Sequence, residues 1–187
     1  MNRYIEEAKN IILSQYPEIA QHKTCMLPEI LLQEGTIAQY IYYIESGILG
    51  VSTHNSETAD DKIIAFFEAG EMVFSCNGII NNLPSILSIK SLTKCDLYVI
   101  DKNDLWRVTD ENSRFYELII RIDNYSLYKI IQNFVDMSHN SPMERYKKLI
   151  NTHPNIVKSI KNKDIASWLN VTPTYLSHQI KNKLFKN

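Results

Sequence analysis

The feature that most constrains the fold is a stretch of 25 residues, 114–138, that contains neither glycine nor proline. Its apolar residues recur at the spacing of a helix, at Leu118, Ile119, Ile122, Tyr125, Leu127, Ile130, Ile131, Phe134 and Val135. At ~1.5 Å per residue this helix spans about 40 Å, more than one small domain covers. We therefore predict that a second copy of the chain packs on it. The alternative is an intramolecular packing helix, because Lys129 and Gln132 interrupt the heptad pattern.

The region before this helix has the pattern of a small β-sandwich or barrel. A first helix is expected over residues 3–16 and ends at Pro17. Turn-prone residues then separate six predicted strands, which are Ile30–Leu32, Tyr40–Ile44, Leu49–Thr53, Ile63–Phe67, Ile86–Ser91 and Leu97–Ile100. The polar stretch from His54 to Asp61 is expected to be a hairpin loop. The chain is thus predicted to be an α+β protein.

Charge divides the chain into two unequal parts. Residues 142–187 hold nine Lys or Arg and two Asp or Glu, a net charge of +7. Residues 1–141 hold 11 basic and 19 acidic residues, a net charge of −8, although the whole chain is close to neutral at −1. A basic C-terminal module suits a polyanionic partner. A solvated lysine-rich tail is the alternative interpretation.

Composition excludes several classes of protein. No apolar run approaches the ~18 residues that a membrane span needs, and the N-terminus lacks the apolar stretch of a signal peptide. We therefore expect a cytoplasmic protein without a membrane partner. Cys25, Cys76 and Cys95 are far apart in the sequence and form no C-x-x-C pair, so neither a disulfide framework nor a cysteine-bound metal is expected.

After a polar break at residues 138–142, read as a hinge, the sequence predicts three short helices over about 143–151, 163–169 and 173–185. The last two have the pattern of a helix-turn-helix. Ala166 is small where the two helices approach, and Asn170 stands at the tight turn, where it tolerates a left-handed backbone. Thr172 is placed to cap the third helix, and Pro173 suits its first position. An ordinary pair of packed helices is the alternative.

The third helix has an inward and an outward face. Leu176, Ile180 and Leu184 repeat every four residues and are expected to face inward. Hydroxyl and imidazole groups can hydrogen-bond to base edges, and lysines can neutralise phosphates. The predicted DNA-binding residues are Lys163, Thr172, Thr174, Tyr175, Ser177, His178 and Lys181.

The order of parts resembles the Crp/Fnr family of bacterial transcription regulators. Ile30-Leu31-Leu32-Gln33-Glu34-Gly35 and Ile41-Tyr42-Tyr43-Ile44-Glu45-Ser46-Gly47 resemble the opening strands of the family's sensor domain, and Ala69-Gly70-Glu71 resembles the turn before its ligand cassette. The segments 163–166 and 172–177 resemble the DNA-reading unit of Bacteroidetes-type members. The resemblance implies a double-stranded β-helix (jelly-roll) sensor domain, residues 1–113; a dimerisation helix and hinge, 114–140; and a helix-turn-helix domain, 141–187. It also implies a homodimer on a palindromic operator in double-stranded DNA.

The sequence departs from this family in three respects. Members that bind cyclic nucleotides pair an Arg with the cyclic phosphate, whereas no Arg occurs here between Arg3 and Arg107. Lys90 and Lys94 lie in this region, but an ammonium does not replace the bidentate guanidinium, so weak or no binding of cyclic AMP is expected. The cysteine cluster of Fnr-type oxygen sensors is missing. The chain stops at Asn187, directly after the predicted recognition helix, so a full β-wing is not expected.

Other functions find less support in the residues. Only His54 lies within the predicted barrel, so a cupin-type metal site lacks its ligands, and no catalytic motif stands out. The protein is therefore expected not to be an enzyme and to need no cofactor. A haem sensor that uses Cys76 is a weaker alternative. The predicted ligand-pocket residues are Phe74, Ser75, Cys76, Ser85 and Ile86, although a pocket filled by side chains fits equally.

Two hypotheses of function remain from different classes. The first is a homodimeric, sequence-specific transcription regulator, for which RNA polymerase and an unknown small-molecule effector are further candidate partners. The second is a protein-interaction module whose DNA-binding unit is degenerate.

Overall fold

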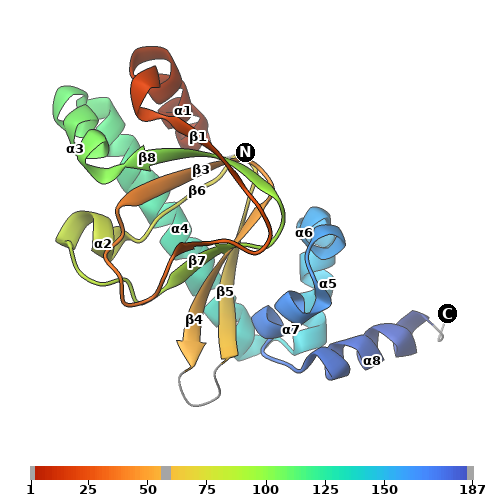
Figure 1. Cartoon of the computed structure of the whole chain (residues 1–187). Helices are drawn as coiled ribbons and strands as arrows, with labels where there is room; N and C mark the ends of the chain where they lie inside the picture. Colours follow the sequence, from red (N-terminus) through yellow and green to blue (C-terminus); the bar gives the residue numbers. More distant parts are fainter. Residues whose placement is uncertain (1–2, 56–59, 185–187) are drawn as a thin grey trace.

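The computed structural model in Figure 1 describes residues 3–55 and 60–184. An N-terminal body rich in β-strands is followed by one long helix, α4, which runs behind it to a group of shorter helices at the C-terminus (Figure 1). This is the mixed α+β architecture predicted from the sequence, with the β-roll, the long helix and the helical unit in the predicted order.

In the described residues, the β-roll consists of two four-stranded antiparallel sheets. The first sheet has the order β1 (Gln21–Cys25), β8 (Cys95–Asp101), β3 (Tyr40–Ser46), β6 (Met72–Val73). The second has the order β2 (Ile30–Leu32), β7 (Ser88–Ser91), β4 (Ile48–Asn55), β5 (Asp60–Glu68). Apart from the β4–β5 hairpin, neighbouring strands are not consecutive in the sequence, so the chain winds between the two sheets. The apolar faces meet in a core that includes Ile41, Leu49, Phe67 and Leu97.

All six predicted strands are present, but the sequence pattern missed β1 and β6. Four of the five residues of β1 are exposed, so this strand lacks the alternation that marks a half-buried strand. The expected loop from His54 to Asp61 is wrong at both ends, since His54 and Asn55 belong to β4, and Asp60 and Asp61 belong to β5. The central part of the predicted loop, residues 56–59, lies outside the described residues.

Three short helices flank the roll. They are α1 (Arg3–Gln15), which is followed by a 3₁₀ turn over Pro17–Ile19, α2 (Cys76–Asn81) and α3 (Lys102–Glu111). Only α1 was predicted; it buries Ile5, Ala8 and Ile12 on one face and packs against α4. The side chain of Asp101 caps α3 by accepting a hydrogen bond from the backbone N–H of Asn103 at 2.8 Å.

The predicted long helix is confirmed as α4 (Ser113–His139). Its first half buries Phe115, Leu118, Ile119 and Ile122 in the core that it shares with α1, α3 and the roll. Its second half leaves large apolar side chains exposed, among them Leu127 and Phe134, of which 51% and 70% are accessible. The helix therefore has one face packed within the chain and a second face that none of residues 3–55 and 60–184 covers.

Over residues 142–184 the structure has four helices where the sequence predicted three. They are α5 (Pro142–Thr152), α6 (Pro154–Ser159), α7 (Asn162–Leu169) and α8 (Pro173–Leu184). The missed helix, α6, begins at Pro154, because proline is accommodated at a first helical position. At the predicted hinge, Ser141 and Glu144 form a capping box that starts α5.

The helical unit packs directly on the roll. One apolar cluster joins Ile48, Ile63 and Phe66 of the second sheet to core residues of the helices, among them Leu149 and Leu169. The rings of Phe66 and Trp168 lie 5.7 Å apart. The β4–β5 hairpin and α7 therefore lie side by side at the same end of the molecule (Figure 1).

Candidate nucleic-acid interface

The turn between α7 and α8 has the geometry that its sequence predicts. Asn170 adopts the left-handed conformation, with φ 59° and ψ 43°. The chain reverses there because the N–H of Val171 donates to the carbonyl oxygen of Ala166 at 3.0 Å. Ala166 is fully buried, which leaves room for the two helices to approach. Such a turn holds two short helices at a steep angle, as in a helix-turn-helix.

The start of α8 is fixed by its cap. Thr172 Oγ1 accepts a hydrogen bond from the backbone N–H of Tyr175 at 3.1 Å, and Pro173 occupies the first helical position. Leu176 is completely buried and Ile180 is partly buried, as the predicted inward face requires. The predicted Leu184 contact lies outside the described side chains. The first turns of α8 are thereby oriented by one cap and one buried leucine.

The predicted DNA-binding residues fall into two groups. Thr174, Tyr175, His178 and Lys181 are exposed on α8, while Ser177 on the same helix is partly buried. Lys163, near the start of α7, and Thr172, in the turn, are exposed and line one groove beside the roll. The structure thus places five of the predicted residues on α8 and the other two, Lys163 and Thr172, beside this helix.

A buried arginine supports this unit from inside. Arg145 of α5 is only 3% exposed, and its guanidinium donates to the carbonyl oxygens of Leu169 and Trp168 at 3.2 and 2.9 Å. The guanidinium also lies 4.7 Å from the ring centre of Trp168. Burial lowers the pKa of Arg145, though not enough to remove its charge. The end of α7, and with it the turn, is therefore anchored to α5. Sequence reasoning missed this residue.

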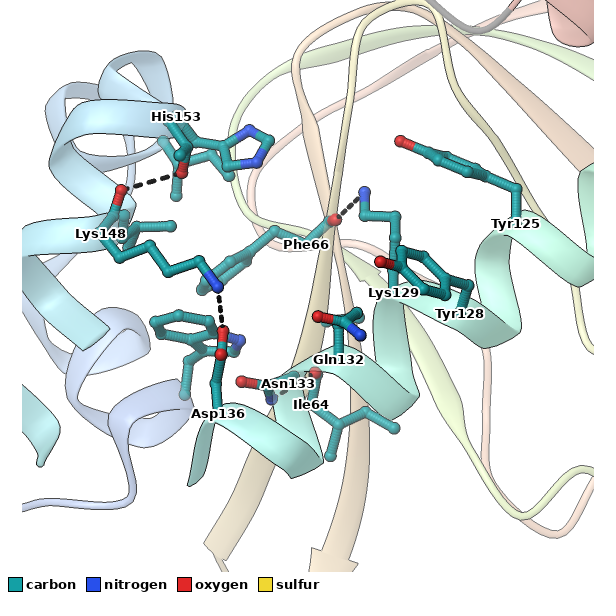
Figure 2. A pocket seen from close by; sticks show the side chains of 15 residues that line it. Ile64, Phe66, Tyr125, Tyr128, Lys129, Gln132, Asn133, Asp136, Lys148 and His153 are labelled. Atoms are coloured by element: carbon teal, nitrogen blue, oxygen red, sulfur yellow. Dashed lines mark hydrogen bonds and ion pairs between the residues drawn. The ribbon is translucent and has the colours of Figure 1, made fainter. Parts of the chain in front are cut away.

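A pocket of about 230 Å³ lies where the roll, α4 and the helical unit meet. Figure 2 shows Lys148 reaching toward Asp136 across it, and the ion pair measures 2.6 Å. At another wall, Lys129 donates to the carbonyl oxygen of Phe66 at 2.8 Å. His153 contacts Glu68 at 2.6 Å and forms a further link between the helical unit and the roll. This pocket could not be predicted from the sequence, because its walls come from segments up to about a hundred residues apart.

The predicted ligand-pocket residues lie elsewhere, around α2. Ile86 is 72% exposed, whereas Ser85 is buried and uses its hydroxyl group within its own turn, donating to the carbonyl oxygen of Leu87 at 2.7 Å. Ser75 is buried, and Phe74 and Cys76 are partly exposed. None of these residues lines the pocket between the roll and the helical unit.

The turn before α2 is tied to the long helix. Glu71 Oε1 and Oε2 accept hydrogen bonds from Lys129 Nζ at 2.7 and 2.8 Å, and Glu71 Oε1 also accepts one from Tyr125 Oη at 3.3 Å. Burial raises the pKa of Tyr125 to about 12, and the nearby carboxylate of Glu71 adds to the shift. Gly70 has a φ of 86°, which favours glycine.

Three comparisons place the chain among known proteins. A model of the cyclic nucleotide-binding domain matches residues 27–112. The chain superimposes on FixK2 from Bradyrhizobium japonicum with a TM-score of 0.75 and 15% identity, covering 88% of this chain and 84% of that one. It also superimposes on CLP, a c-di-GMP responsive global regulator from Xanthomonas campestris, with a TM-score of 0.74 and 12% identity, covering 92% and 90%. No curated protein matches the sequence.

A putative transcriptional regulator of the Crp/Fnr family from Eubacterium rectale is similar over the whole of this chain and 85% of its own length, with a TM-score of 0.75 and 10% identity. Residues 27–112 are thus similar to cyclic nucleotide-binding domains. The chain as a whole has the fold of Crp/Fnr regulators, which confirms the resemblance found in the sequence. In the described part of the chain, no helix combines the length and the apolar character that crossing a bilayer demands.

Proposed function

We propose that this protein is a homodimeric transcription regulator of the Crp/Fnr type that binds DNA sequence-specifically. The observation that carries the proposal is the α7–α8 pair, in which a left-handed Asn170 and the Thr172 cap orient α8 with its outer face exposed. Such a helix fits the major groove of B-DNA, which is about 12 Å wide. The similar solved structures, several of them described as regulators, support the same role.

The exposed residues of α8 divide by the chemistry they offer. Thr174 and His178 carry groups that can hydrogen-bond to base edges. Lys181 and Lys163 offer ammonium groups, which suit phosphates. Thr172, Tyr175 and the partly buried Ser177 complete the proposed surface, with hydroxyl groups that serve either purpose.

The uncovered face of α4 supports the dimer. Ile120, Leu127, Ile131 and Phe134 are all exposed and follow one another at intervals of seven, four and three residues. This spacing places them along one stripe of the helix, as in a coiled coil. Asn124, also exposed, fills the remaining position of the stripe between Ile120 and Leu127. A second copy of α4 would cover these side chains.

The roll is proposed to serve as an effector domain that binds cyclic AMP poorly. The absence of any arginine between residues 3 and 107 removes the guanidinium that would pair with a cyclic phosphate. The buried hydroxyl of Ser85 is engaged with the backbone of Leu87. A different small molecule and RNA polymerase are the further partners that this role implies.

The experiment that tests the proposal is selection of binding sites from random duplex DNA with the purified protein. Enrichment of an inverted repeat, with half-sites about one helical turn (~34 Å) apart, is the expected result for a dimer that reads DNA. A folded, dimeric protein that enriches no sequence, with or without cell extract as a source of effector, would contradict it. Binding of a partner protein without DNA would then favour an interaction module.

A further inference from the structure

A groove of about 620 Å³ separates the β4–β5 hairpin from the helix-turn-helix. One wall belongs to the roll and carries Asp61, Lys62 and Lys90. The other wall includes Lys163, Asp164, Ser167 and residues 170–173. The roll therefore presents charged side chains directly opposite two of the proposed DNA-contacting residues, Lys163 and Thr172.

The hydroxyl of Ser167 fixes the roll to α7 at this groove. Ser167 Oγ donates to the carbonyl oxygen of Asp61 at 2.9 Å and accepts from the N–H of Ile63 at 3.0 Å. These are the backbone groups on either side of Lys62. Because β5 is the outer strand of its sheet, its edge is free to make these bonds. The backbone of Lys62 is thus held in register with α7.

The three lysines that line the groove differ in whether they form an ion pair. Lys90 forms a 2.7 Å ion pair with Asp61, and this hydrogen bond, together with one to His54, holds the pKa of Asp61 low. Lys62 and Lys163 are exposed, and within residues 3–55 and 60–184 neither forms an ion pair. With Asp61 matched by Lys90, Lys62 and Lys163 outnumber Asp164 in the rest of the groove.

We propose that Lys62 of the roll is a phosphate-contacting residue of the DNA interface, and that Ser167 is its positioning residue. This rests on the proposed function. The groove opens at the turn that leads into α8, and the phosphates beside a recognition helix are bound by the residues that flank such a turn. A phosphate backbone that passes along the groove meets on each wall a lysine that is unpaired within the described residues, Lys62 on the roll and Lys163 on α7.

The test measures affinity for the selected operator duplex at several salt concentrations, with the full chain. We expect Lys62→Ala to weaken binding about 5- to 10-fold at about 0.1 M salt and to lower the log–log salt slope by about 0.9, the value of one phosphate contact. Lys62→Arg should keep the slope. The matched control is Lys102→Ala, which removes a lysine at the start of α3, on the far side of the roll from α7 (Figure 1).

A double-mutant cycle tests the role of Ser167. Ser167→Ala alone should reduce the salt slope in part, and it should have no further effect on the slope when Lys62 is already alanine. A residue that only holds the fold together would lower affinity equally in both backgrounds. Thermal unfolding of each variant shows whether the fold is retained.

The outcomes separate the two proposals. Suppose that the wild-type protein binds its operator and that Lys181→Ala weakens this binding. If Lys62→Ala and Lys62→Glu then leave the affinity and the salt slope unchanged, the role of Lys62 is overturned and the proposed regulator function stands. If wild type binds no DNA, both proposals fail. A loss of affinity in Lys62→Ala that is independent of salt would also overturn the phosphate contact.

Discussion

Arg145 Nη2 donates a hydrogen bond of 2.9 Å to Asn133 Oδ1, across the joint between α5 and α4. Asn133 Nδ2 in turn donates to the carbonyl oxygen of Ile64 in β5 at 2.9 Å. One arginine and one asparagine therefore connect the helical unit, the long helix and the roll. Because the guanidinium is buried, the connection is shielded from water and from salt.

Replacing Arg145 by methionine should destabilise the protein by about 2–4 kcal/mol, because the carbonyl oxygens of Leu169 and Trp168 and the amide oxygen of Asn133 lose their donor. Urea unfolding followed by tryptophan fluorescence measures the effect, with Lys147→Met, an exposed position on the same helix, as the control. Equal stability of Arg145→Met and wild type would show that the buried guanidinium contributes nothing net.

The exposed stripe of α4 leads to a prediction about assembly. Leu127→Lys and Phe134→Lys should each raise the dimer dissociation constant at least about tenfold, or ~1.4 kcal/mol, because a charge would enter an apolar interface. Sedimentation equilibrium measures the constant. Met26→Lys, at a position that is 68% exposed in the turn before β2, serves as the control. A wild-type protein that is monomeric at all concentrations would refute the dimer.

Local rules account for the parts of the structure that the sequence predicted. Asn170 and Thr172 were identified because a left-handed turn and a helix cap depend on a few adjacent residues. The long helix followed from the period of its apolar residues. The strand β1 was not predicted because it is polar and pairs with β8, whose partner residues lie 70 or more positions away. The same pairing brings Cys25 opposite Cys95, although the sequence separates them widely; both are free thiols.

The site was predictable on one side only. The residues of α8 could be assigned to a face from their spacing, since side chains four apart share a face. The opposite wall, with Lys62 in β5, could not be predicted, because its place beside Lys163 depends on how the roll and α7 pack. The Arg145–Asn133 hydrogen bond could not be predicted either. Only 12 positions separate the two residues in the sequence, but they belong to different helices, α5 and α4, and the bond depends on how these helices pack.

The α8 residues should separate affinity from specificity. Lys181→Ala should weaken binding to all duplexes and lower the salt slope by about 1. His178→Ala or Thr174→Ala should change the preference at one base pair by about 1–3 kcal/mol and leave the slope unchanged. Competition binding with single-base operator variants measures both. If all three variants bind like wild type, α8 is not the reading helix.

Cyclic AMP should bind weakly or not at all, because no guanidinium is present to pair with its phosphate. Calorimetric titration of the full-length protein is expected to show no saturation at concentrations up to about 1 mM, which limits any binding to less than ~4 kcal/mol. Micromolar binding would show that lysines or backbone N–H groups replace the arginine, and Lys90→Ala would then be the first variant to examine.

The thiol of Cys76, at the start of α2, should be slow to react despite its partial exposure. Burial raises its pKa to about 11, and the charge of Asp123 adds to the shift. Since the thiolate is the reactive form, about one molecule in a thousand carries it at a pH of about 8. The alkylation rate should therefore rise about tenfold per pH unit up to a pH of about 10, as peptide mapping after timed iodoacetamide treatment can show. Cys25 and Cys95, which are fully buried, serve as internal controls that stay unmodified. A plateau near the pKa of a free thiol, about 8.5, would show that Cys76 is solvated.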